Sequence, residues 1–231
     1  TGIDERKGGI VRMQEGQTIL FDMDGTILDT EKYYRLYWRL AAQDCGYELT
    51  DEQVLGLRSL GQPYAQKRIQ ELCGNEWAYQ EIHTRRSEMM NQRLEKDGIP
   101  VKPYAGEALR ELKKRGYQLA VATASDLTRT QNYLTQTHLI SYFDRLICAT
   151  MVEHGKPSPD IYLYACKELG VTPAHTWAVE DSPNGVRSAY DAGCRVIMIP
   201  DQTLPEPELI PLLSLQVNDL QELLIHFPRI Q

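Results

Sequence analysis

The stretch FDMDGTILDTE, residues 21–31, places four acidic side chains directly after the apolar run at 18–21. Two of them, Asp22 and Asp24, are separated by one methionine, and Gly25 follows, which allows the backbone to turn sharply without strain. Two carboxylates at the end of an apolar strand are typical of a chemical site at the edge of a buried sheet. The same pair could also cap a loop, so the remainder of the chain decides between these interpretations.

Short apolar runs alternate with helical patterns along most of the chain. We expect strands at 18–22, 117–123, 145–150, 176–180 and 195–199, and a short one near 215–217. The helices expected between and after them lie at 104–115, 126–137, 159–170 and 183–192, with a final helix in the tail. Near-continuous apolar runs are typical of parallel strands that are buried on both faces. The alternation therefore predicts an α/β fold with a doubly wound parallel sheet.

Residues 32–103 interrupt this alternation because they contain no strand pattern. Amphipathic or helical runs at 32–45, 51–57, 63–73 and 76–97 predict a small all-helical cap instead. We therefore predict a catalytic core formed by 1–31 and 104–231, with the cap inserted after the first strand. Asp29 and Glu31 are interpreted as the exit from the core into the cap, and Asp29 or Thr30 is expected to cap the first cap helix.

Composition excludes several classes of protein. The 231 residues are 42% apolar, enough for a packed core, and the net charge of −7 argues against a nucleic-acid surface. No apolar stretch reaches the ~18–20 residues that span a membrane. Five dispersed cysteines indicate reduced thiols in a cytoplasmic protein. We expect a monomer without nucleic-acid or membrane partners, assign no function to the polar opening residues 1–17, and interpret part of them as foreign to the protein.

Chemically useful side chains follow three further strands. Thr123 lies in VATASD after the second strand, Lys156 in HGKPSPD after the third, and Glu180 and Asp181 in VEDSPNG after the fourth. Each has an ordinary structural explanation when taken singly. Because the carboxyl ends of parallel strands meet at one edge of a sheet, we expect all of them to converge on the two aspartates of the first strand.

Clustered carboxylates repel one another unless a cation lies among them, and a set of oxygen ligands favours Mg²⁺. A hydroxyl and a lysine beside that ion suggest a phosphate group, held by Thr123, by the N–H groups of the helix that begins near Asp126, and by Lys156. Asp22 at the strand tip is then the candidate nucleophile. Asp24 is the candidate general acid, which would later activate water as a base.

Four motifs in order give the sequence a clear family resemblance. FDMDGTILDTE, VATAS, GKPSPDIY and EDSPNGVRSAYDAG resemble the motifs of the haloacid dehalogenase superfamily of phosphohydrolases. The resemblance implies a Rossmann-like core with a helical cap, and an Mg²⁺-dependent reaction through an aspartyl-phosphate.

The resemblance also implies roles for individual residues. The implied metal ligands are Asp22, Asp24 through its backbone carbonyl, Asp181 and Glu180; the implied phosphate-binding residues are Thr123, Ala124 and Lys156. The dehalogenases themselves lack the second aspartate, so the presence of Asp24 argues against that branch.

Three interpretations of the function stay open. The first is a phosphatase of a small phosphorylated metabolite, either a sugar phosphate or a nucleotide-like monophosphate. The second is a β-phosphoglucomutase-like enzyme, but that family usually carries a histidine where this chain has Tyr34. The third is a non-enzymatic or regulatory protein, which the presence of every motif residue opposes. Tyr34 and Arg58 are the candidate specificity residues of the cap, and Arg58 could pair with a second phosphate or a carboxylate.

Overall fold

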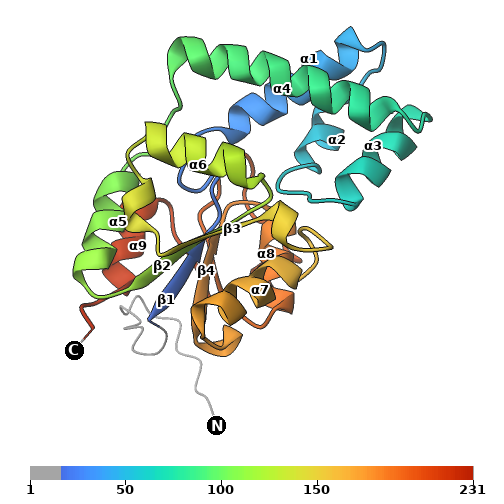
Figure 1. The fold of residues 1–231 in the computed structure, drawn as a ribbon. Helices are drawn as coiled ribbons and strands as arrows, with labels where there is room; N and C mark the ends of the chain where they lie inside the picture. The colour runs from blue at the N-terminus through green and yellow to red at the C-terminus, as the bar shows by residue number, and fades with distance from the viewer. Residues whose placement is uncertain (1–16, 231) are drawn as a thin grey trace.

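The computed structural model describes residues 17–230. Our interpretation of the opening residues concerns 1–17, of which 1–16 lie outside the described residues. Within this range six parallel strands form one sheet in the order β3-β2-β1-β4-β5-β6 (Figure 1). The strands are β1 (Thr18–Phe21), β2 (Gln118–Thr123), β3 (Arg145–Cys148), β4 (Thr176–Glu180), β5 (Arg195–Met198) and β6 (Leu215–Gln216). The central strand β1 pairs Phe21 with Val121 of β2 and with Val179 of β4, so the ends of these three strands lie level with one another.

Nine α-helices lie within residues 17–230. In the first half of the chain they are α1 (Glu31–Asp44), α2 (Asp51–Leu55), α3 (Tyr64–Cys73), α4 (Ala78–Asp97) and α5 (Ala105–Lys114). In the second half they are α6 (Leu127–Gln136), α7 (Asp160–Leu169), α8 (Pro183–Asp191) and α9 (Leu220–His226). None of them combines the length and apolar character that a membrane crossing requires.

Helices cover both faces of the sheet. Ile19 and Phe21 of β1 pack into the apolar cluster that includes α5 and α9, whereas Leu20 packs into the cluster that includes α7 and α8. This alternation follows from the two-residue period of a strand. Figure 1 shows α5 and α9 on one side of the sheet and α7 and α8 on the other. The predicted α/β class with a doubly wound parallel sheet is confirmed.

Helices α1 to α4 form a separate apolar cluster above the sheet (Figure 1). Its centre holds Trp38 of α1, Ile69 of α3 and Ile82 of α4. The chain enters this cap near Asp29 and leaves it near Pro100. The two segments lie side by side, since the N–H of Asp29 donates to the carbonyl of Pro100 at 2.9 Å. The cap helices therefore occupy the predicted part of the chain, while the exact domain boundaries stay a prediction.

The element bounds agree with the sequence-based expectations to within a few residues. The clearest difference is at 145–150, where the strand ends at Cys148 and a 3₁₀ turn, Ala149–Met151, follows. Ala149 belongs to the wall of the central cavity described below, so the chain leaves the sheet where that cavity begins.

Candidate active site

The acidic stretch after β1 lies at the carboxyl edge of the sheet, next to the end of β4. The N–H of Asp22 donates to the carbonyl of Val179 at 3.0 Å, which extends the pairing of the two strands. Gly25 then adopts a φ of 89°, a conformation that side chains disfavour. A Cβ atom at Gly25 would also lie within 3.0 Å of the Asp181 carboxylate. Glycine at this position therefore allows the turn to pack directly against Asp181.

Lys156 holds two of the predicted carboxylates together beneath the cavity. Its Nζ is fully buried and donates to Asp22 Oδ1 at 2.6 Å, to Glu180 Oε1 at 2.6 Å and to the carbonyl of Ala122 at 2.9 Å. Burial disfavours the ammonium, but the two carboxylates outweigh that effect, so the pKa of Lys156 lies above its usual value. The hydroxyl of Tyr162 on α7 also donates to Glu180 Oε1.

Asp22, Glu180 and Asp181 form a buried acidic cluster whose candidate ligand oxygens all lie within 4.8 Å of one another. One oxygen of each, namely Asp22 Oδ2, Glu180 Oε2 and Asp181 Oδ2, has no hydrogen-bond partner among the described residues. Burial raises the pKa of Asp22 and of Asp181, and their neighbouring carboxylates raise it further. A buried cluster of three carboxylates, each with an oxygen that lacks a partner, fits a divalent cation, since a cation would compensate their charge and could supply missing partners.

Asp24 lies apart from this cluster and has partners of its own. Thr30 Oγ donates to Asp24 Oδ1 at 2.6 Å, and Ser125 Oγ donates to Asp24 Oδ2 at 3.0 Å. Burial raises the pKa of Asp24. Thr30 occupies the N-cap position of the first cap helix, as expected, but its hydroxyl forms no capping bond and donates to Asp24 instead.

The segment after β2 supplies hydroxyl and N–H groups to the same place. Thr123 ends the strand, and its Oγ accepts a hydrogen bond from the N–H of Ser125 at 3.1 Å. Helix α6 begins at Leu127, where Asp126 is the N-cap and accepts from the N–H of Arg129. Ala124 lies between the strand end and this helix start, and its role in binding phosphate stays a prediction.

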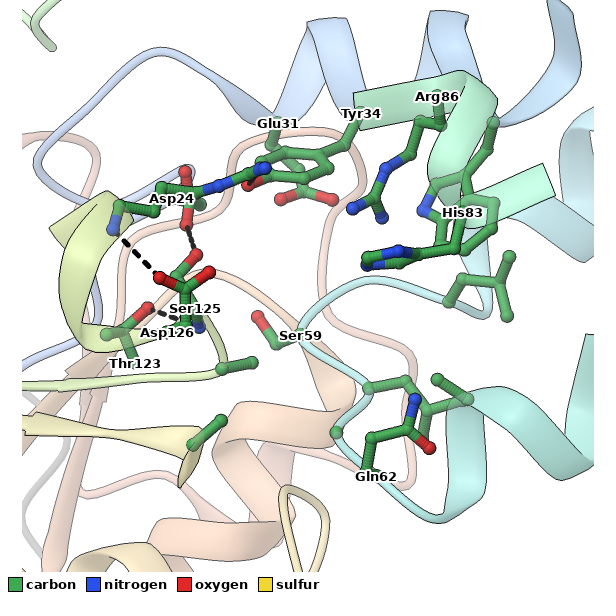
Figure 2. A pocket seen from close by; sticks show the side chains of 18 of the residues that line it. Asp24, Glu31, Tyr34, Ser59, Gln62, His83, Arg86, Thr123, Ser125 and Asp126 are labelled. Carbon is green, nitrogen blue, oxygen red and sulfur yellow. Dashed lines mark hydrogen bonds between the residues drawn. The ribbon is translucent and has the colours of Figure 1, made fainter. Parts of the chain in front are cut away.

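A cavity of about 160 Å³ lies between the core and the cap. Its core wall consists of Asp22, Asp24, Thr123, Ala124, Ser125, Asp126, Arg129 and Ala149. Its cap wall consists of Glu31, Tyr34, Trp38, Leu57, Ser59, Leu60, Gly61, Gln62, Ala65, Tyr79, His83 and Arg86. Figure 2 shows Asp24 and Thr123 on one side of this space and His83 and Arg86 on the other. Lys156, Glu180 and Asp181 are fully buried and are not among the residues that line the cavity.

The two predicted specificity residues have different positions. Tyr34 lies on the cap wall, where its hydroxyl accepts a hydrogen bond from Arg129 Nη1 at 3.0 Å. Arg58 is buried outside the wall, and its guanidinium donates to the carbonyl of Leu55 and to Thr203 Oγ, both at 2.9 Å. This position does not support the predicted contact between Arg58 and the substrate.

Sequence reasoning missed Arg86, His83 and Glu31, which all line the cavity. Arg86 had a recognisable signal. The buried positions of α4 recur every four residues as Ala78, Ile82, Arg86, Met90 and Leu94. A charged side chain in the middle of an apolar stripe indicates a buried polar site. Glu31 had no such signal, because it is indistinguishable in sequence from an ordinary acidic residue in the first turn of a helix.

Comparison with known proteins assigns the family. Residues 19–199 match the family model described as "Haloacid dehalogenase-like hydrolase". The chain belongs to the haloacid dehalogenase-like hydrolases. The predicted family is thereby confirmed.

Relatives and solved structures agree with this family. The putative phosphatase YhcW of Bacillus subtilis is 30% identical, covering 80% of this chain and 84% of that protein. The "Phosphorylated carbohydrates phosphatase" of Thermotoga maritima is 29% identical, covering 77% and 82%. A crystal structure of CbbY from Rhodobacter sphaeroides in complex with xylulose-(1,5)bisphosphate has a TM-score of 0.76 at 27% identity, covering 91% and 99%. A β-phosphoglucomutase is also among the relatives. The predicted enzyme class, a phosphoric monoester hydrolase, is confirmed by relatives named as phosphatases.

Proposed function

We propose that this hydrolase is an Mg²⁺-dependent phosphatase that cleaves a small phosphorylated metabolite through an aspartyl-phosphate on Asp22. One observation carries the proposal: three buried carboxylates lie close enough to share a metal ion, each keeps an oxygen without a hydrogen-bond partner among the described residues, and one of them, Asp22, lines the cavity. Asp22, Glu180 and Asp181 would hold the metal ion, together with the backbone carbonyl of Asp24. When bound, Mg²⁺ supplies positive charge that favours the approach of a carboxylate to a phosphate dianion.

In the first half of the reaction, an oxygen of Asp22 attacks phosphorus and the bond to the leaving alcohol breaks. Lys156 offsets the negative charge of Asp22 from below, through its bond to Oδ1. Asp24 gives its proton to the leaving oxygen. The raised pKa of Asp24 suits this role, because a general acid must carry its proton near the working pH.

In the second half, Asp24 takes a proton from water, which attacks the aspartyl-phosphate and releases inorganic phosphate. Thr30 and Ser125 orient the Asp24 carboxylate for both proton transfers. Thr123, the backbone around Ala124 and the N–H groups at the start of α6 would bind the phosphate oxygens. The dipole of α6 adds to this attraction, since the positive end of a helix dipole is its N-terminus.

The supported substrate class is a sugar phosphate or a similar small monophosphate. The cavity volume of about 160 Å³ suits a small metabolite rather than a macromolecule. The name of the Thermotoga relative specifies phosphorylated carbohydrates, and the CbbY structure contains a sugar bisphosphate. A cytoplasmic location and a monomeric state stay predictions.

A β-phosphoglucomutase-like reaction is the alternative. The presence of Tyr34 argues against the mutase reaction. Burial raises the pKa of this phenol above its usual value, and its hydroxyl oxygen accepts a hydrogen bond from Arg129. A tyrosine in this state does not exchange a proton near neutral pH as histidine does. An isomerisation assay with β-glucose 1-phosphate distinguishes the two: conversion to glucose 6-phosphate in excess of phosphate release would favour the mutase.

The proposal predicts Mg²⁺-dependent release of phosphate from p-nitrophenyl phosphate, and loss of that activity by about 10⁴-fold or more in Asp22→Asn. Asp29→Asn is the matched control, since Asp29 belongs to the same stretch but pairs with Lys32 and lies off the cavity wall. This control should retain the activity. Activity retained in Asp22→Asn would exclude Asp22 as the nucleophile, and a wild-type protein inactive with Mg²⁺ would overturn the proposed function.

A further inference from the structure

Arg86 is a buried cation on the cap wall that lacks an anionic partner. It is 6% exposed, and its Nε has no hydrogen-bond partner among the described residues. Among residues 17–230 its one side-chain hydrogen bond is long, 3.4 Å from Nη2 to the hydroxyl of the adjacent Ser87. Within residues 17–230 no carboxylate lies within ion-pairing distance of Arg86, although Glu31 shares the cavity wall. A buried charge without a counter-charge is costly, which makes this arrangement unusual for a purely structural arginine.

Aromatic rings hold the guanidinium in place. The Arg86 Cζ lies 4.4 Å from the centroid of the Trp38 ring and 5.1 Å from that of Tyr34. Figure 2 shows the guanidinium of Arg86 pointing toward the middle of the pocket, next to His83. Stacking on aromatic faces orients a guanidinium but leaves its N–H groups free for a ligand in the plane of the group.

A second arginine increases the positive charge at the same place. Arg129 also lines the cavity, and its charge acts on Arg86, whose pKa is lowered by burial and by this repulsion. Arg129 Nη1 donates to Tyr34, whereas the buried Nε of Arg86 has no hydrogen-bond partner among the described residues. In a protein with a net charge of −7, Arg86 on the cap wall and Arg129 on the core wall supply local positive charge that favours an anion in the cavity between them.

We propose that Arg86 binds a second anionic group of the substrate, a carboxylate or a second phosphate, at the cap end of the cavity. The inference rests on the proposed function, because it assumes that the first phosphate lies at the core end beside Asp22. The substrates favoured by this protein are therefore phosphorylated acids or bisphosphates. Sugar monophosphates without a second anionic group are less favoured. We assign to Arg86 the anion-binding role expected of Arg58, since Arg86 lines the cavity and Arg58 does not.

Two matched pairs of ligands test this proposal. 3-Phosphoglycerate differs from glycerol 3-phosphate by a carboxylate in place of a hydroxymethyl group, and fructose 1,6-bisphosphate differs from fructose 1-phosphate by one phosphate. Dissociation constants are measured by calorimetry with Mg²⁺ in the Asp22→Asn background, so that the ligands stay intact. We expect the more anionic member of at least one pair to bind about tenfold or more tightly, as for a hydrogen bond to a charged group. The pair that shows the preference distinguishes a carboxylate from a phosphate.

Adding Arg86→Gln should abolish that preference, and adding Arg86→Lys should restore part of it. Arg85→Gln is the matched control, because Arg85 is the adjacent arginine but is exposed and pairs with Asp44 and Glu88. This control should keep the full preference. The proposal is overturned if neither pair shows a preference, or if the preference survives Arg86→Gln. These outcomes are independent of the proposed function, which fails if the wild-type enzyme does not hydrolyse p-nitrophenyl phosphate.

Discussion

Next to the core end of the cavity the buried cation Lys156 has carboxylate partners, whereas at the cap end the buried cation Arg86 has none among the described residues. Lys156 contacts two carboxylates at 2.6 Å and a carbonyl oxygen, and all of these groups are buried. Arg86 is almost as deeply buried, but its charge contacts aromatic rings and no carboxylate. The difference indicates two kinds of site. At the core end, internal ion pairs hold the carboxylates in place for chemistry common to the family. At the cap end, we expect the substrate to supply the missing anionic partner of Arg86.

Removing each cation should expose this contrast most strongly. Lys156→Met leaves Asp22 and Glu180 without their buried counter-charge, and we expect the free energy of unfolding to fall by about 3–5 kcal/mol. Arg86→Met should change it by no more than about 1 kcal/mol, since lost stacking is offset by relief of an unpaired buried charge. Urea unfolding of both variants without metal measures the difference. Equal losses of stability would show that the two ends do not differ in this way.

The metal end should depend on the absence of a side chain at one turn. Gly25→Ala places a Cβ against the Asp181 carboxylate, so we expect Mg²⁺ affinity, measured by calorimetry, to fall by about tenfold or more. Gly46→Ala is a matched control: Gly46 has a similar φ of 83°, but no atom lies within 4 Å of its added Cβ. The control should lose about 1 kcal/mol of stability and no metal affinity. Unchanged Mg²⁺ affinity in Gly25→Ala would contradict the assignment of Asp181 as a metal ligand.

The smallest expected effect is the contribution of His83, at the cap end, to the pH dependence of the free energy of unfolding. Burial lowers the pKa of His83 to about 4, whereas the unfolded chain binds this proton near pH 6.5. His83 should therefore reduce the free energy of unfolding as the pH falls from about 6.5 to 4, and have no effect above that window. Because the ring is partly exposed, we expect a contribution of about 1 kcal/mol. Urea unfolding at pH 7 and 4.5 should show a smaller pH-dependent loss in His83→Gln, and an identical loss would contradict the assignment.

The strands and the core end could be predicted because each depends on local patterns. An apolar run predicts a buried strand, and the parallel arrangement brings the residues after β1, β2 and β4 to one edge. Asp22, Thr123 and Asp181 could therefore be placed together although they are far apart in sequence. The hydrogen bond from Thr30 to Asp24 was not predictable, because a hydroxyl at a helix start normally caps that helix.

The sequence by itself determined the α/β fold, the helical insertion and the family of the enzyme, because strand ends and their motifs follow from short-range patterns. Only the tertiary structure decided which cap residues line the cavity. Arg58 lies in the turn after α2 and Arg86 lies on α4, which packs against α1, and of the two only Arg86 lines the cavity. The physical reason is that a helix distributes its side chains around its axis, and which face becomes a cavity wall depends on neighbours from elsewhere in the chain.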